Sequence, residues 1–344
     1  MSGIVESLVC PECRKGRLTF SGAWCCGRCQ ASFTGAARYL DRLGDTVTTT
    51  GQHYALQWGS ELGFLKFLKA KPAAKKHMPA GQLGWDRLIG EIRERAVAGK
   101  VSVYDAACGF GGIASDLVDH ATVSGLTYLG ADVHSALEII HDEVPLLSTC
   151  GFLVRMDVAE PPPVDFAFDY VICRAALHHT PDPPRTFGTL ARTVKPGGTL
   201  AISVYNKKSV CREALDDRLR ELVSPLPPRE AFERSREFTV LGRALQNVKD
   251  KVHLGEDLEL LGIPQGDHSV HELVYYYFLK CFHNDDFGEA FSTLVNYDWY
   301  HPAYAFRYHL DEARAWFEEN GLDVIDAYSI PVQHFLLGKR RADP

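Results

Sequence analysis

Short apolar runs alternate with longer polar segments between residues 101 and 205. Five of these runs have the length and composition of buried strands: VSVYDAA, TYLGADV, FLVRMDV, FDYVICRAAL and TLAISVY. The segments between them are long enough to hold crossover helices. Such alternation is typical of a parallel sheet, in which ligands bind at the carboxyl ends of the strands. The pattern therefore predicts a doubly wound α/β domain with a binding crevice at that edge.

The pattern changes after residue 205. Residues 206–309 have mainly helical periodicity and many aromatic and histidine side chains. They are followed by LDEARAWFEENG, which predicts a helix ending at Gly321, and by VIDAYSI and HFLLGKR, which predict a terminal β-hairpin. We therefore expect a seven-stranded sheet formed by residues 101–205 and 310–344, with residues 206–309 as a helical insertion that covers the substrate. Residues 46–100 form a predicted helical lead-in.

The first 45 residues carry a different signal. Two CxxC pairs, Cys10 with Cys13 and Cys26 with Cys29, have the spacing that directs four thiolates at one ion. The twelve residues between the pairs are enough for a β-hairpin. We predict a zinc ribbon over residues 1–45, held by structural Zn²⁺. Unligated cysteines or a redox CxxC are the alternatives, although the redox motif lacks its usual βαβ context, and Cys25 is a less well spaced substitute for Cys26.

Composition and charge restrict the expected location and partners of the protein. The chain has 344 residues, 46% of them hydrophobic, with a formal net charge of -7. It contains no apolar run long enough to span a membrane and no signal-peptide pattern, so we expect a cytoplasmic protein that makes no membrane contact. The negative charge makes nucleic acid an unlikely main partner. A small-molecule substrate is expected instead, and a homodimer is compatible with the sequence.

The segment YDAACGFGGIASDL joins the first predicted strand to a helix through a glycine-rich loop. Gly109, Gly111 and Ala114 also fit the GxGxxA pattern of dinucleotide sites, with Asp132 at the distance of a ribose-binding acid. In dinucleotide sites, however, the strand usually leads directly into the first glycine. Here Asp105 and three small residues intervene, and an acid at this position suits a cationic amino-acid group better than a pyrophosphate.

Two further acids follow the next strands. Asp132 ends the second predicted strand and is suited to accept hydrogen bonds from both ribose hydroxyls. Asp157 ends the third and, with Val158, is placed to meet an adenine edge. Three carboxylates along one crevice therefore favour a sulfonium nucleoside as the cofactor.

These segments resemble the motif series of the class I S-adenosylmethionine-dependent methyltransferases. The resemblance rests on DAACGFGG, LGADVH, RMDVAEPP and FDYVICRAALHHTPDPPRTFGTLARTVKPGGTLAISVY. It implies a Rossmann-like fold and S-adenosyl-L-methionine as cofactor, with the glycine loop at the methionine part, the second-strand acid at ribose and the third-strand acid at adenine. The chain departs from the common ExGxGxG pattern at Ala107 and Cys108 and by a double glycine within the loop. The predicted cofactor-binding residues are Tyr54, Trp58, Asp105, Ala107, Gly109, Gly111, Asp132, Val133, Asp157, Val158 and Arg174.

The sequence motifs identify the residues around the methyl acceptor less specifically than those around the cofactor. A proton acceptor for the substrate is expected among His178, His179, His301 and Tyr205. The first two follow the fourth strand in LHHTPDP, where a structural role is the alternative. Tyr297, Trp299, Tyr300 and Tyr304 belong to an aromatic segment that suits an apolar substrate cover, with helix packing or a dimer surface as the alternative.

Three functional hypotheses follow. Methyl transfer to a small molecule, of the kind found in specialised metabolism, agrees best with the charge and the insertion. An RNA base methyltransferase that uses the ribbon for recognition would need a basic path formed by Lys66, Lys69, Lys71, Lys75 and Lys76. An oxidoreductase that binds a nicotinamide dinucleotide is the third, and it would bind NAD in place of the sulfonium cofactor.

Overall fold

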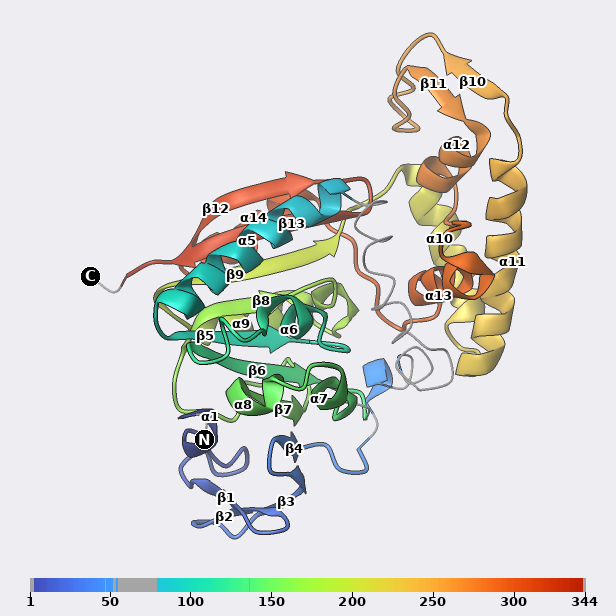
Figure 1. Ribbon diagram of the computed structural model, residues 1–344. Helices are drawn as coiled ribbons and strands as arrows, with labels where there is room; N and C mark the ends of the chain where they lie inside the picture. Colours follow the sequence, from blue (N-terminus) through green and yellow to red (C-terminus); the bar gives the residue numbers. More distant parts are fainter. Residues whose placement is uncertain (1–2, 47, 52–53, 55–78, 136, 343–344) are drawn as a thin grey trace. The chain divides into compact units, whose positions relative to one another are not determined.

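The computed structural model describes residues 3–46, 48–51, 54, 79–135 and 137–342 (Figure 1). The backbone divides into two compact units. The sheet unit comprises Met1–Gly51, Met78–Val204 and His309–Pro344, and the helical unit comprises Gln52–His77 and Tyr205–Tyr308.

Seven strands of the sheet unit form a doubly wound sheet. They are β5 (Val101–Ala106), β6 (Leu126–Asp132), β7 (Gly151–Arg155), β8 (Phe168–Cys173), β9 (Val194–Tyr205), β12 (Leu322–Ser329) and β13 (Gln333–Arg340), in the spatial order β7-β6-β5-β8-β9-β13-β12. β5 pairs in parallel with both β6 and β8, so the order of addition reverses between β5 and β8. β12 and β13 form the terminal antiparallel hairpin. The predicted α/β fold class is confirmed.

The cysteine-rich segment extends this sheet. Its strands β1 (Leu18–Phe20), β2 (Trp24–Cys26), β3 (Ser32–Ala36) and β4 (Tyr39–Asp41) form an antiparallel series, and β4 pairs in parallel with β7. Eleven strands of the described residues therefore make one sheet. The Trp24 indole N–H donates to the carbonyl oxygens of Ala36 and Tyr39, both at 2.9 Å, and the ring packs on Phe152 of β7. This addition to the sheet was not anticipated from the sequence.

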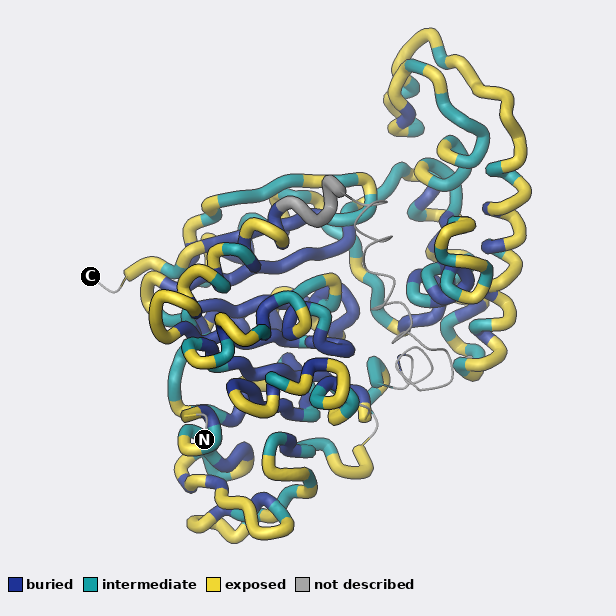
Figure 2. The backbone as a smooth tube through the Cα atoms, viewed as in Figure 1, coloured by how far each residue is buried: buried dark blue, intermediate teal, exposed yellow. Residues whose placement is uncertain are grey.

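Helices cover both faces of the sheet. α5 (Pro79–Ala98), α6 (Gly112–Leu117), α7 (Ile139–Glu143) and α8 (Leu147–Cys150) contribute to one hydrophobic core, together with Val103 and Ile172 of the central strands. Side chains alternate along a strand, so Tyr104 points to the opposite face, where it stacks on Phe168. α9 (Pro183–Arg192) and α14 (Leu310–Glu319) pack together in the sheet unit through the ring contact of Phe187 with Phe317. Every residue of β5 is buried (Figure 2).

The helical unit is built on α10 (Val210–Val223), α11 (Pro228–Gln246), α12 (Val270–Tyr277) and α13 (Gly288–Tyr300). α11 and α13 meet through a buried 3.0 Å hydrogen bond between the hydroxyls of Thr239 and Thr293. A hairpin of β10 (Lys251–Leu254) and β11 (Gly266–Ser269) separates α11 from α12. Ser269 begins α12 with a capping box that Glu272 completes. The sequence pattern indicated the helices of this unit but not its hairpin.

Two smaller elements complete the described chain: α1 (Gly3–Glu6) and a 3-10 turn, η1 (Leu177–His179), after β8. Among the helices of the described residues, none combines the length and the apolar composition needed to cross a membrane.

Candidate cofactor site and cysteine cluster

The glycine-rich loop leaves β5 through three left-handed residues. Ala107, Gly109 and Gly111 have φ values of 60, 54 and 73°. Glycine adopts this conformation readily, whereas alanine does so at a cost of roughly 1–2 kcal/mol. A Cβ added at Gly111 would lie 2.6 Å from the Ile140 side chain, so this glycine is needed for space as well as for conformation. Ala107 therefore carries backbone strain at the position where the chain departs from the expected motif.

Two residues fix the loop, one at the end of β6 and one just after it. Oδ2 of the buried Asp132 accepts the backbone N–H of Gly109 at 2.9 Å, and its Oδ1 accepts the N–H of Val133 at 2.7 Å. Nε2 of His134 lies 3.0 Å from the carbonyl oxygen of Gly109. The imidazole also packs edge-on against Phe110. Sequence reasoning missed His134; its position two residues after the strand-end acid was the available signal.

Asp105 lies one residue before the end of β5 and is only 1% exposed. The Tyr128 hydroxyl donates to its Oδ2 at 2.6 Å. Burial raises the pKa of Asp105 to about 7, the hydrogen bond from Tyr128 and the charge of Arg174 act in the opposite direction, and the charge of Asp132 adds to the rise. A cation near this carboxyl group would favour its ionised form.

Asp157 and Val158 follow β7. Oδ1 of Asp157 accepts the N–H of Ala159 at 2.9 Å, and the Val158 side chain is buried. The N–H of Met156 donates to the carbonyl oxygen of Asp132 at 2.8 Å, which ties this turn to the end of β6. The acids predicted at three strand ends therefore lie at the carboxyl ends of three adjacent strands.

Arg174 follows β8 directly. Its guanidinium carbon lies 5.4 Å from the centroid of the Trp85 ring on α5, a cation–π contact. The next residue, Ala175, has φ of 53° and donates its N–H to the Ser203 hydroxyl at 2.9 Å. Each of the neighbouring strands β5 and β8 is thus followed within two residues by a strained alanine. Sequence reasoning missed Trp85, because an aromatic side chain at helical spacing is usually a packing residue.

His178 and His179 are buried in η1, with their ring centroids 4.3 Å apart. The carbonyl oxygen of His179 accepts the Thr50 hydroxyl at 3.2 Å. Their role as proton acceptors stays a prediction.

Most of the remaining predicted site residues lie in the described part of the helical unit. Tyr205 donates to Oδ2 of Asp298 at 3.2 Å, and Nε2 of His301 lies 3.1 Å from the carbonyl oxygen of Leu226. Tyr297, Trp299 and Tyr300 are buried on α13, Tyr304 is half-buried, and Tyr54 is buried as well. Trp58 and the lysines of the predicted basic path lie outside the described residues. These assignments also stay predictions.

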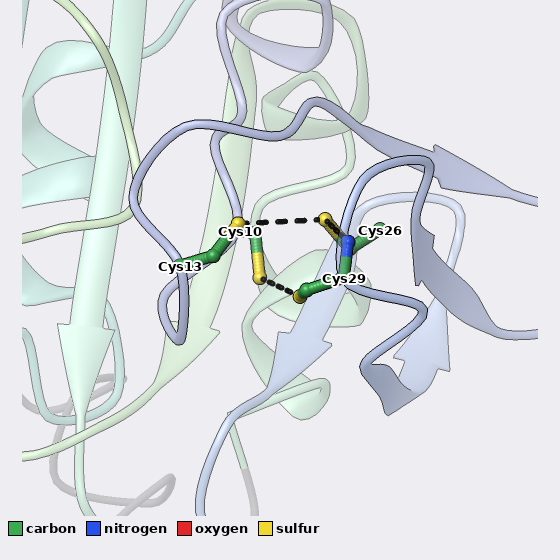
Figure 3. Close-up of side chains that lie close together, drawn as sticks. All are labelled: Cys10, Cys13, Cys26 and Cys29. Carbon is green, nitrogen blue, oxygen red and sulfur yellow. Dashed lines mark hydrogen bonds between the residues drawn. The ribbon is translucent and has the colours of Figure 1, made fainter.

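The four cysteines of the two CxxC pairs converge (Figure 3). Their sulfur atoms all lie within 4.8 Å of one another, with Sγ–Sγ distances of 3.6 Å between Cys10 and Cys29 and 3.7 Å between Cys13 and Cys26. A tetrahedral zinc site with Zn–S bonds of about 2.3 Å has sulfur–sulfur edges of about 3.8 Å. The donor set therefore fits Zn²⁺ in both chemistry and size.

Backbone geometry around the cluster favours thiolates at two positions. Hydrogen bonds from the N–H groups of Lys15 and Gly16 lower the pKa of the Cys13 thiol to about 6. A hydrogen bond from the N–H group of Cys29 lowers the pKa of the Cys26 thiol. Cys25 stands outside the cluster, 3.7 Å from the Ser32 hydroxyl, because successive side chains of a strand point to opposite sides.

In comparisons with known proteins, part of the sheet unit is similar to methyltransferases. Residues 104–202 match the methyltransferase domain family. The ubiquinone biosynthesis O-methyltransferase of Pseudomonas syringae pv. tomato is 36% identical over 124 residues, which cover 35% of this chain and 50% of the relative. Phosphoethanolamine N-methyltransferase 2 of Caenorhabditis elegans is 30% identical over 115 residues, covering 31% and 24% of the two chains. The chain thus spans about half the length of the first relative and less of the second.

Among solved structures, the magnesium protoporphyrin IX methyltransferase of Synechocystis PCC 6803 with bound S-adenosylmethionine is similar over 89% of this chain and all of its own. Its sequence identity is 12% and its TM-score is 0.43.

Proposed function

We propose that this chain, whose residues 104–202 form a methyltransferase domain of class I, transfers a methyl group from S-adenosyl-L-methionine to a small-molecule acceptor. One observation carries the proposal. The glycine loop, Asp132 and Asp157 lie together at the ends of adjacent strands, within the segment that matches the methyltransferase family. Dinucleotide enzymes share the glycine loop but not the acid and three small residues that precede it here.

In this proposal, the residues at the strand ends bind different parts of the cofactor. Asp132, already oriented by two backbone N–H donors, accepts the ribose hydroxyls. Asp157 and Val158 meet the adenine, and Asp105 provides negative charge near the amino-acid part. When bound, S-adenosyl-L-methionine would supply an electrophilic methyl group; in-line attack by the acceptor would break the sulfur–methyl bond and release S-adenosylhomocysteine. Holding the reactants in this geometry contributes most of the rate, up to about 7–11 kcal/mol in favourable systems.

A small molecule is the proposed acceptor class. The net charge of -7 disfavours a polyanionic substrate. The first relative is named for O-methylation in ubiquinone biosynthesis, which is chemistry on a small molecule. In this proposal His178 or His179 accepts a proton when the nucleophile must lose one, typically worth about 100- to 10,000-fold in rate.

Calorimetric titration with S-adenosylhomocysteine, using NAD as the matched control, tests the cofactor class. We expect the first ligand to bind with micromolar affinity and NAD to give no heat. Selective binding of NAD would refute the proposal.

A structural zinc ion at Cys10, Cys13, Cys26 and Cys29 is the second part of the proposal. The Sγ–Sγ distances and the four-thiolate donor set support it. Its closed coordination would leave no open position for catalysis, so its contribution would be to the fold.

A further inference from the structure

Four cationic side chains surround one indole in the helical unit. The ring of Trp299 has Lys280 Nζ at 4.8 Å from its centroid, the guanidinium carbon of Arg212 at 5.4 Å, Lys208 Nζ at 5.6 Å and the guanidinium carbon of Arg307 at 6.0 Å. Trp299 itself is 1% exposed. Such a density of positive charge in the interior requires anions to balance it.

Asp216 is the buried carboxylate at the centre of this cluster, and its hydrogen-bonding capacity is filled. Oδ2 accepts Nε of Arg212 and, at 2.8 Å, the indole N–H of Trp299. Oδ1 accepts the Tyr300 hydroxyl at 2.8 Å and the backbone N–H of Lys280 at 3.1 Å. A carboxylate offers about four acceptor positions, so Asp216 has none left for the Lys280 ammonium group.

Lys280 is 5% exposed. Within the part of the chain that the structure describes, no carboxylate lies within ion-pair distance of its Nζ. Asp298 attracts it only from further away and already accepts a hydrogen bond from Tyr205. Burial lowers the pKa of Lys280 to about 8. The ammonium group thus lies in the interior with an aromatic face as its direct contact.

Arg307 provides a second donor with spare capacity. Its Nε pairs with Glu213 at 2.8 Å and its Nη2 with Asp217. Its Nη1 is buried and has no hydrogen-bond partner among the described residues. The side chain is 9% exposed. A buried donor left unpaired costs about 1–3 kcal/mol, so its retention calls for a ligand.

We propose that the helical unit binds the carboxylate of a small organic acid beside Trp299, with Lys280 as the main cation and Arg307 as a further donor. The charges within contact favour a monoanion. Glu213, Asp216 and Asp217 pair with Arg212 and Arg307, so Lys280 is the cation proposed to meet the single carboxylate. No residue of the proposed cofactor site takes part in this site, although Trp299 also belongs to the predicted substrate cover.

The test uses benzoate as probe and the full chain without cofactor, followed by calorimetry. Benzamide serves as the neutral analogue and inorganic phosphate as the alternative anion. We expect benzoate to bind, and Lys280→Met to weaken its binding at least about tenfold. Lys249→Met, which removes an exposed lysine of the same unit, should leave affinity unchanged. Equal benzoate affinity in Lys280→Met and the parent would overturn the proposal, as would equally tight binding of benzamide or phosphate.

A measurement of unfolding distinguishes whether Lys280 binds a ligand or stabilises the fold. Without ligand, Lys280→Met should unfold at the same or a higher denaturant concentration than the parent, because the substitution removes a buried charge without a direct ion-pair partner. A clear loss of stability would make Lys280 structural and contradict the proposal. Arg307→Gln is the second variant, expected to weaken benzoate binding about fivefold. Binding of S-adenosylhomocysteine to the same variants reports on the cofactor site separately.

Discussion

The carboxylate of Asp132, at the end of β6, accepts the backbone N–H of Gly109 at 2.9 Å, in the loop that follows β5. One side chain thus fixes the shape of the loop and lies where the proposed ribose would bind. Preorganisation of this kind reduces the ordering that a ligand must impose on its site.

Replacing Asp132 by Ala should weaken S-adenosylhomocysteine binding by at least about tenfold, since it removes both the proposed ribose contact and the hold on Gly109. Asp132→Asn, which keeps an acceptor oxygen for the Gly109 N–H, should lose less. Calorimetry on both variants measures the difference. Undiminished affinity in the alanine variant would exclude Asp132 from the cofactor site.

Asp105 should make stability fall as pH rises. Its pKa is about 7 in the folded chain, against 3.8 as the ordinary value, so the folded state binds more protons between those two pH values. Stability is then lost across roughly pH 4–7, in total on the order of 4 kcal/mol. The free energy of unfolding of Asp105→Asn, compared with the parent at pH 5, 6, 7 and 8, isolates this contribution. The advantage of the variant should grow with pH up to about 7 and then level off.

Tyr128→Phe is the companion variant to Asp105→Asn. Its hydroxyl favours the ionised carboxylate, so its removal should raise the pKa of Asp105 further and move the pH transition upward. An unchanged transition would show that another group titrates.

Ala107→Gly should stabilise the fold. The left-handed conformation of Ala107 costs roughly 1–2 kcal/mol, while the greater freedom of glycine in the unfolded chain offsets about 0.5–1 kcal/mol. We expect a net gain of about 0.5–1 kcal/mol by urea unfolding. Ala106→Gly, at the buried end of β5, is the matched control and should destabilise the fold. Equal losses in both variants would contradict a strained Ala107.

Two helical glycines should respond to alanine in opposite ways. A Cβ at Gly242 of α11 would lie 2.1 Å from the carbonyl oxygen of Cys281, so Gly242→Ala should destabilise the helical unit by about 1–3 kcal/mol. Gly90 of α5 has open space around its Cβ position, and Gly90→Ala should stabilise the chain by about 1 kcal/mol through helix propensity. Thermal unfolding of both variants provides the comparison.

Replacing Cys10 and Cys13 by Ser should release one zinc ion per chain and lower stability, since the thiolates are the proposed ligands. Cys25→Ser, outside the cluster, should retain the metal. Elemental analysis of the purified variants measures zinc content. A double variant that keeps both zinc and the parent's unfolding midpoint would refute a structural metal site.

Local signals accounted for much of the sheet unit. The strand-end acids Asp132 and Asp157 and the glycine loop were predictable because each follows an apolar run with the length of a strand. The β1–β2 hairpin also agrees with the expected connection between the cysteine pairs. These features are determined within segments of about ten residues.

The missed features depend on contacts between distant segments. His134 acts on Gly109, 25 positions away, and Trp85 contacts Arg174 of another element. β4 has three residues, which are too few to show a recognisable hydrophobic period. It forms a strand because it pairs with β7. β10 shows no apolar run, because its residues are largely exposed. Periodicity cannot identify a role that only tertiary contacts create.

Pairing of β4 with β7 also has a consequence for colloidal behaviour. β7 is buried at four of its five positions, and β4 covers the hydrogen-bonding edge that would otherwise end the central sheet. An uncovered strand of this kind presents unpaired N–H and C=O groups to other chains and templates aggregation. The cysteine-rich segment therefore protects an edge of the sheet, and chelation of the proposed zinc ion should first cause turbidity and self-association.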